Sequence, residues 1–189
     1  MLDEANVGRY RDMLNELGLA YLEAGHLDEA VAAFTRLTSL QPDNASAFQL
    51  LGTAYHSAGE LDRALVAYER ANAITPRAPA YSNIGIIHDA RGEFAKAVAS
   101  YRQAIAIQPK QAATHRNLAE SLSGLGRSRE AAAEYVMAAA LARDAIRVNP
   151  ADARAHALVG LCEARVGHES LARAAIAEAR RLAPNDNEV

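Results

Sequence analysis

The chain has 189 residues and a formal net charge of −3, so it carries no strongly basic field that would attract nucleic acid. Half of the residues are hydrophobic, as in a soluble, well-packed protein, and the excess of arginine over lysine indicates a GC-rich bacterial source. Cys162 is the only cysteine, which excludes an intrachain disulfide and a thiolate metal cluster. The first residues lack the apolar segment of a signal peptide, and no apolar run reaches membrane-spanning length. We therefore expect a cytoplasmic protein that does not insert into a membrane.

Apolar residues at helical spacings recur in pairs of segments, each pair separated by a glycine turn and most pairs closed by a proline. In residues 50–76, Gly59 marks the turn and Pro76 ends the second helix. A lone helical hairpin cannot bury both apolar faces, so we expect the copies to stack. Residues 1–10 either extend the first helix backwards or are the remnant of an upstream element. A single array then spans 11–186, before a tail at 187–189, with hairpins at 11–44, 45–77, 78–111, 112–152 and 153–186.

The fourth hairpin departs from the others in length. Its terminal proline, Pro150, arrives seven residues later than the spacing in the third hairpin predicts, and nothing from Ser128 to Asn149 breaks a helix. Seven residues add nearly two whole turns, so the apolar face stays in phase. We expect one second helix of about six turns here.

Recurring landmarks carry a family resemblance. In the first copy they are Leu17, Gly18, Tyr21, Ala30, Phe34 and Pro42, and the other copies align on Gly52, Gly85, Ala119 and Gly160. The copies resemble the tetratricopeptide repeat, whose pattern is L-G-x-x-Y, A-x-x-x-F and a final P. The third copy has His88, and the fifth has Glu163 and Ile176, at the aromatic sites.

The resemblance implies an all-α fold, a right-handed superhelical α-solenoid of five hairpins with an elongated second helix in the fourth. Small residues let the two helices of a hairpin approach closely, so the second-helix alanines should be buried. These are Ala30, Ala64, Ala97, Ala131 and Ala172.

A finer resemblance concerns the 33-residue step into the third hairpin and the turn DAIRVNPADA. Both are similar to repeat regions of bacterial eukaryotic-type serine/threonine kinases and related multidomain regulators, although the chain contains no kinase motif. The array also stops without a polar capping helix, which leaves Leu171 and Ile176 partly uncovered. Two alternatives follow: a regulatory or substrate-recruiting arm of a larger enzyme, such as a kinase or glycosyltransferase, and a module that self-assembles into a homo-oligomer through uncapped ends.

The resemblance also implies that the first helices line a concave groove, the usual binding surface of solenoids. We therefore expect a non-catalytic scaffold that binds a peptide or helix of a partner protein there. The predicted groove residues are Asn15, Leu19, Gln49, Thr53, His56, Ser82, Asn83, Ile86, Asp89, Arg116, Asn117, Glu120, Arg154 and Arg165.

Asn83 and Asn117 occupy matching positions, where paired amides could hold an extended peptide backbone; the alternative is that they are merely solvated. Some members of the family clamp a chaperone's C-terminal carboxylate with cations at set positions, but no window of this chain has those cations. Charge varies along the array: residues 1–44 carry three arginines against eight acids. Either a partner with an acidic segment near the last copy is favoured, or the surface is ordinarily charged.

No catalytic motif stands out. His115 and His156 share the position of Phe48 and Tyr81 in other copies, which indicates packing roles. The chain has no H-x-x-x-H or H-E-x-x-H motif, and the Gly126 segment that resembles a phosphate loop aligns with the hairpin turns. We expect no enzyme activity, no metal and no cofactor.

Overall fold

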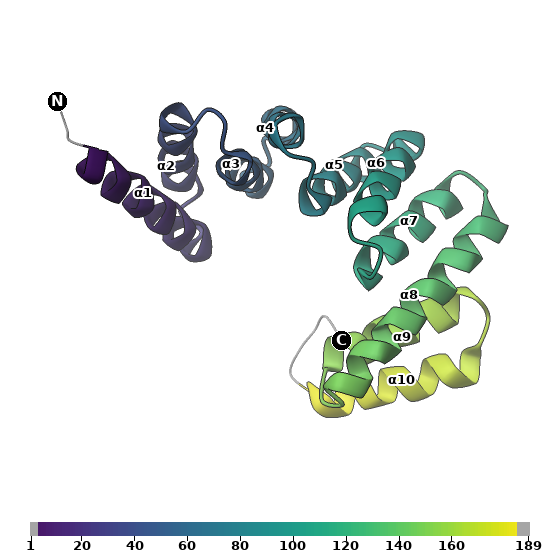
Figure 1. Cartoon of the computed structure of the whole chain (residues 1–189). Coiled ribbons are helices and arrows are strands. Elements are labelled where there is room, and N and C mark those ends of the chain that lie inside the picture. The colour runs from purple at the N-terminus through teal and green to yellow at the C-terminus, as the bar shows by residue number, and fades with distance from the viewer. Residues whose placement is uncertain (1–3, 185–189) are drawn as a thin grey trace. The chain divides into compact units, whose positions relative to one another are not determined.

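A computed structural model describes residues 4–184, so the predicted tail and Asp186 lie outside the described residues. The described part forms ten α-helices and no strand, which confirms the all-α prediction (Figure 1). The helices are α1 (Glu4–Ala24), α2 (Leu27–Leu40), α3 (Ala45–Ser57), α4 (Leu61–Ile74), α5 (Ala78–Ala90), α6 (Phe94–Ile107), α7 (Ala112–Gly124), α8 (Ser128–Val148), α9 (Ala153–Arg165) and α10 (Glu169–Leu182).

The chain divides into two compact units, an N-terminal unit of residues 1–87 and a C-terminal unit of residues 88–189. In the N-terminal unit, α2 packs on both α1 and α3, and α3 packs on α4. In the C-terminal unit, each helix from α6 to α10 packs on the next. Consecutive hairpins therefore stack within each unit, as expected of an α-solenoid, whereas the right-handed superhelical path stays a prediction. Among the described residues, no helix is long and apolar enough to cross a membrane.

Every hairpin turns at a glycine whose backbone lies in the left-handed region. At the second turn, Gly59 has a φ of 77° and its N–H donates to the carbonyl of His56. The N–H of Glu60 also donates back, to the carbonyl of Tyr55 at 2.8 Å, which closes the end of α3. The same left-handed φ recurs at Gly25, Gly92, Gly126 and Gly167. The apparent phosphate loop around Gly126 is thus a hairpin turn.

A second type of glycine brings the two helices of a hairpin into contact. A Cβ atom built at Gly52 would lie 2.7 Å from the ring of Tyr68, and one at Gly18 would lie 2.7 Å from the ring of Phe34. The second-helix alanines lie beside these contacts and are at most 4% exposed, which confirms the prediction for Ala30, Ala64, Ala97, Ala131 and Ala172.

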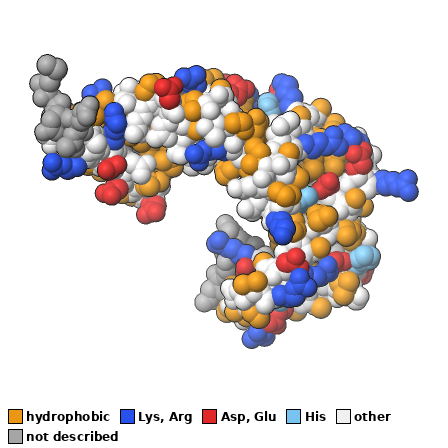
Figure 2. Space-filling view, viewed as in Figure 1, with side chains coloured by type: hydrophobic (Ala, Val, Ile, Leu, Met, Phe, Trp, Pro, Cys, Tyr) orange, Lys and Arg blue, Asp and Glu red, His pale blue; other side chains and the backbone are white. Residues whose placement is uncertain are grey.

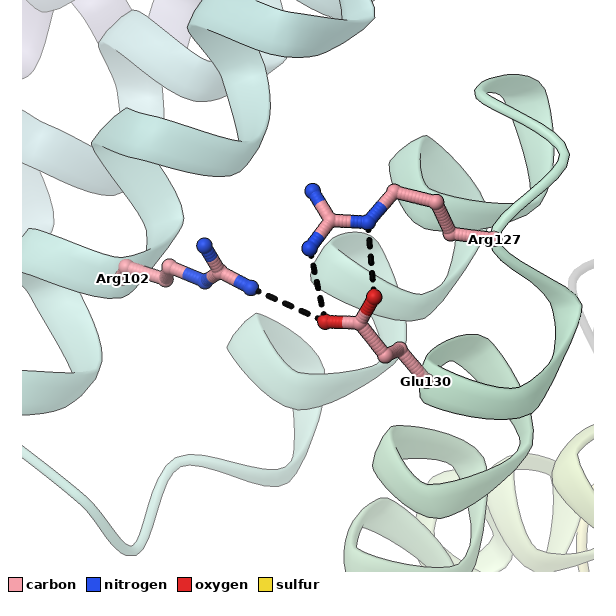
Figure 3. Close-up of polar contacts among 3 residues, drawn as sticks. All are labelled: Arg102, Arg127 and Glu130. Carbon is pink, nitrogen blue, oxygen red and sulfur yellow. Dashed lines mark hydrogen bonds and ion pairs between the residues drawn. The ribbon is translucent and has the colours of Figure 1, made fainter.

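The long fourth hairpin has the predicted form. Helix α8 is a single helix of 21 residues. Its buried face runs through Ala131, Tyr135, Ala138 and Ala142, so the extra turns continue the same apolar stripe. The start of α8 is tied to α6 by Glu130 (Figure 3).

Glu130 lies between two arginines. Its carboxylate accepts two hydrogen bonds from Arg127, each 2.7 Å, and one of 3.2 Å from Arg102 of α6 (Figure 3). All three side chains are 39–52% exposed, so this group orients the helix start and adds little stability.

Candidate functional site

The predicted groove residues all lie on first helices of hairpins, and every one of them is exposed or half-buried. In the N-terminal unit they are Asn15 and Leu19 on α1, Gln49, Thr53 and His56 on α3, and Ser82, Asn83 and Ile86 on α5. In the C-terminal unit they are Asp89 at the end of α5, Arg116, Asn117 and Glu120 on α7, and Arg154 and Arg165 on α9.

Several of these residues also hold neighbouring helices together. The Tyr68 hydroxyl of α4 donates a 3.2 Å hydrogen bond to Thr53 Oγ1 on α3, and the Thr53 hydroxyl donates to the carbonyl of Gln49. Burial raises the pKa of Tyr68, while its hydrogen-bond interactions with Thr53 and then Asn83 act in the opposite direction. Asn83 on α5 thus lies near Tyr68 of the preceding hairpin and is half-buried.

Asp89 plays the same internal role in the C-terminal unit. Its Oδ2 accepts a 2.9 Å bond from the Tyr101 hydroxyl of α6, and its Oδ1 accepts a 2.7 Å bond from the Ser121 hydroxyl of α7. Burial, followed by the negative charge of Asp89, raises the pKa of Tyr101, so the phenol stays a donor. Both carboxylate oxygens of Asp89 thus have partners within the fold.

Asn117 fixes the position of its neighbour. Its Oδ1 accepts hydrogen bonds from Arg116 Nε at 3.2 Å and Nη2 at 2.8 Å. The amide oxygen is therefore occupied, and the Arg116 guanidinium is held at the surface of α7.

An open hollow of about 610 Å³ lies in the C-terminal unit, bounded by α7, α9 and α10. Among the predicted groove residues it brings together Arg116 and Arg154. The apolar lining comes from Ala113, Ala157, Leu158, Leu161 and Ile176, and Arg180 completes the rim. Arg165, Asn117 and Glu120 do not line this hollow. A smaller hollow of about 280 Å³ in the N-terminal unit includes Asn15.

The three arginines of the hollow are available to a ligand. Arg116, Arg154 and Arg180 make no ion pair with any carboxylate within residues 4–184. The carboxylates of α9 and α10 are committed to other cations: Glu163 to Arg143, Glu169 to Arg173 and Glu178 to Arg181. The hollow therefore combines an apolar floor with a rim of three arginines that are in no ion pair within the described part of the chain.

Sequence analysis did not identify Ile176 and Arg180 as site residues, although both depart from the repeat pattern. Ile176 stands where the other hairpins have a buried aromatic residue: Phe34, Tyr68, Tyr101 and Tyr135 are at most 3% exposed. Arg180 stands where earlier hairpins have Thr38, Asn72, Ile105 and Ala139. A comparison of second helices as well as first helices would have singled them out.

The histidines predicted to pack also make polar links. His115 is buried, and its Nδ1 lies 2.6 Å from Glu134 Oε2 on α8 while its Nε2 lies 2.9 Å from the carbonyl of Pro109. His156 repeats the second link, with Nε2 at 3.1 Å from the carbonyl of Pro150. Both histidines therefore tie a first helix to the proline turn before it.

The third and fifth hairpins have a histidine and a glutamate at the same two positions, but in the opposite order along the chain. In the third, His88 Nδ1 donates to Glu93 Oε2 at 2.6 Å; in the fifth, His168 Nδ1 donates to Glu163 Oε2 at 2.6 Å. Glu163 is 5% exposed and also accepts from Arg143 of α8. The first hairpin instead sets Tyr21 edge-on against His26.

The described residues show no chemically activated group. Burial raises the pKa of the Cys162 thiol to about 11, so this cysteine is neutral at physiological pH. Within residues 4–184, no three His, Cys, Asp or Glu side chains are placed to hold a metal ion.

Comparisons with known families agree with the geometry. A family model described as tetratricopeptide repeat matches residues 15–79, and one described as TPR repeat matches residues 90–126. The chain belongs to the tetratricopeptide repeat family. The two matches together span just over half of it, and the described α9 and α10 add a further hairpin of the same form.

Solved structures with the same arrangement include several of MamA. A crystal structure of MamA protein is 20% identical, covers 96% of both chains and has a TM-score of 0.66. MamA 41-end from Desulfovibrio magneticus RS-1 is 14% identical with a TM-score of 0.68, over 94% of this chain and 97% of that chain. At these identities the likeness shows the fold alone. No curated protein sequence matches the chain. The resemblance to kinase repeat regions is not confirmed and stays a prediction.

Proposed function

We propose that this tetratricopeptide repeat protein is a non-catalytic scaffold, which binds a peptide or helix of a partner protein along the first helices of its hairpins. The observation that carries the proposal is the open hollow whose lining includes the first-helix residues Arg116, Arg154, Leu158 and Leu161. Apolar surface with a few convergent polar groups is what a specific binding site requires.

Each hairpin has one set of residues that pack in its core and another set on its surface, and this difference supports the proposal. Residues that recur between copies, such as Leu51, Ala64 and Tyr68, are buried and hold the fold. The first-helix position that follows the landmark Gly or Ala varies between Leu, Thr, Ile and Glu, and its apolar members Leu19 and Ile86 are 36–38% exposed. Surface that varies between otherwise similar hairpins can distinguish partners without a cost to the stack.

Affinity capture with matched variants tests this function. One pair of variants, Leu19→Glu and Ile86→Glu, places a negative charge on first helices. The control pair, Val66→Glu and Val136→Glu, places the same charge on second helices, at side chains that are more exposed. We expect the first-helix variants to lose the captured partners and the second-helix variants to keep them. The circular dichroism spectra of all four variants should match that of the native chain, which shows that they are folded. If partners are lost only with the second-helix variants, the binding surface is formed by the second helices and the proposal is wrong.

Self-assembly is a second candidate, because α10 exposes apolar side chains. Leu171 is 52% exposed and Ile176 is half-buried. Light scattering over a concentration series separates the candidates: a scaffold for other proteins stays monomeric, while a self-assembling module grows in mass, and Leu171→Gln reduces that growth.

A further inference from the structure

We propose that the hollow between α7, α9 and α10 accepts an acidic segment of a partner protein that inserts one apolar side chain, an inference that rests on the function proposed above. The apolar floor takes the inserted side chain, and Arg116, Arg154 and Arg180 pair with carboxylates on either side of it. The chemistry of the partner is thereby narrowed from any peptide to an acidic one with an apolar anchor.

The floor is suited to an anchor because one side chain is smaller than its counterparts. Ile176 replaces the aromatic ring that packs against the first helix in the other hairpins, and its Cγ1 approaches Gly160 closely. Leu158 and Leu161 flank it and are half-buried, so their remaining exposed surface would be covered by an inserted side chain. Removing this apolar surface from water favours binding.

The rim is suited to carboxylates because its charges come from three helices and none of them is paired with a carboxylate within residues 4–184. Arg116 on α7 is pre-oriented by Asn117 Oδ1, which lowers the entropic cost of pairing it with a ligand. Arg154 on α9 and Arg180 on α10 are exposed. In Figure 2, Lys and Arg side chains lie among hydrophobic and acidic ones over the part of the surface formed by α7 to α10.

A carboxylate-bearing peptide fits this arrangement better than other occupants. A basic segment would meet three guanidinium groups. The carboxylates of α9 and α10 are paired with other cations, and Glu120, one turn from Arg116 on α7, can relieve only part of the repulsion. A single-chain fatty acid offers one carboxylate for three arginines. A free C-terminal carboxylate is not required, since the side chains of Asp and Glu supply the charges.

Fluorescence anisotropy with defined peptides tests the proposal on the full chain. The probe is a short labelled peptide, acetylated and amidated at its ends, with Asp and Glu flanking a central leucine and phenylalanine. One control exchanges the acidic residues for lysine, and the other exchanges the central pair for serine. We expect saturable binding of the probe alone, weakened when salt rises from about 0.05 M to about 0.5 M.

Variants locate the bound peptide. Arg154→Gln and Arg180→Gln should each weaken binding by about three- to fivefold, as for loss of one exposed ion pair, while Arg129→Gln on α8 removes the same charge outside the hollow and should change nothing. Ile176→Phe restores the repeated aromatic, keeps the hairpin folded and should weaken binding by about tenfold because it fills the floor.

The proposal is wrong if the chain binds the probe and the serine control with equal affinity. It is also wrong if the Arg129→Gln and Arg180→Gln variants bind the probe with equal affinity. Displacement of the peptide by dodecanoate at an equal concentration, or concentration-dependent self-association that Arg180→Gln abolishes, would also overturn it, since a lipid or a second copy would then be the occupant. Captured partners that respond to Leu19→Glu while no acidic peptide binds would leave the scaffold function standing and reject this assignment alone.

Discussion

At Gly52 the two helices of the second hairpin touch without room for a methyl group. The built Cβ lies 2.7 Å from Tyr68, whose ring is fully buried and cannot withdraw. We predict that Gly52→Ala lowers the free energy of unfolding by about 1–3 kcal/mol through overpacking. Urea denaturation followed by circular dichroism measures this change.

Gly8 of α1 is the matched control for that substitution. Nothing lies within 4 Å of a Cβ built there, so Gly8→Ala should leave stability unchanged or raise it by about 0.5–1 kcal/mol through helix propensity. Equal destabilisation by both substitutions would mean that the Tyr68 contact does not decide the cost.

Glu163 is a buried carboxylate, and its titration should be visible in stability. Burial would raise its pKa, but hydrogen bonds from Arg143 and then His168 outweigh burial and hold the pKa below its usual value of 4.5. Because the pKa is lower in the folded state, this stabilisation is complete above the unfolded-state pKa and is lost as pH falls through the folded-state pKa.

We predict that Glu163→Gln lowers the free energy of unfolding at pH 7 by about 1–3 kcal/mol, because bonds to a charged acceptor are lost. The variant should also lose stability less steeply than the native chain below pH of about 4.5. Urea titrations at several pH values give both quantities. Glu169→Gln, which breaks an ion pair that is at least 80% exposed, should change little; parallel pH profiles for Glu163→Gln and the native chain would contradict the account.

At the residue scale, the sequence predicts the residues that recur between hairpins but does not predict which side chains hydrogen-bond to one another. The turn glycines and buried alanines are readable because five copies repeat them at one spacing. The sequence predicts Asp89 as a groove residue but not that its two carboxylate oxygens accept hydrogen bonds from Tyr101 and Ser121 on two other helices. Such partnerships depend on how helices from different hairpins approach, which no local pattern encodes.

At the element scale, the third and fifth hairpins each have a histidine–glutamate pair at the turn between their two helices, with the two residues in exchanged positions. Each replaces the first-helix aromatic with one member of a histidine–glutamate pair and places the other just before the second helix. The polar pair thus lies at the turn where the first two hairpins have Tyr21 and Tyr55. The long helix α8 belongs to the same arrangement, because its Arg143 supplies the second partner of Glu163.

This exchange predicts a double-variant result. His88→Glu alone sets two carboxylates together and Glu93→His alone sets two imidazoles together, so each should destabilise the protein by about 1 kcal/mol. The combined His88→Glu and Glu93→His variant recreates the pair of the fifth hairpin and should recover most of the loss. Thermal unfolding of the four proteins measures the coupling, and additive losses would refute it.

Helix existence and length were predictable from the sequence for physical reasons. Apolar spacing sets which face is buried, and the absence of Gly or Pro between Ser128 and Asn149 allows α8 to continue. The sequence left open whether residues 1–10 extend the first helix, since they lack a repeat landmark, and within the described residues α1 runs through 4–10.

At the scale of the whole molecule, the two units differ in charge. Residues 1–87 carry six basic and eleven acidic side chains, whereas residues 88–189 carry fourteen basic and twelve acidic ones. The hollow lies in the more basic unit. From its charge, the sequence left open an acidic partner segment near the last copies or an ordinarily charged surface. The hollow itself depends on Ile176 and Arg180 of a second helix, whereas the predicted groove positions are on first helices.

The central claim is that partners are recognised by the first helices of the hairpins. Hydroxyl-radical footprinting of the chain with and without a captured partner tests this directly, because it reports side-chain exposure residue by residue. We predict protection of first-helix residues such as Leu19, Ile86 and Leu161, with Val66 and Val136 unchanged. Protection confined to Val66, Val136 and Met137 on second helices would contradict the account.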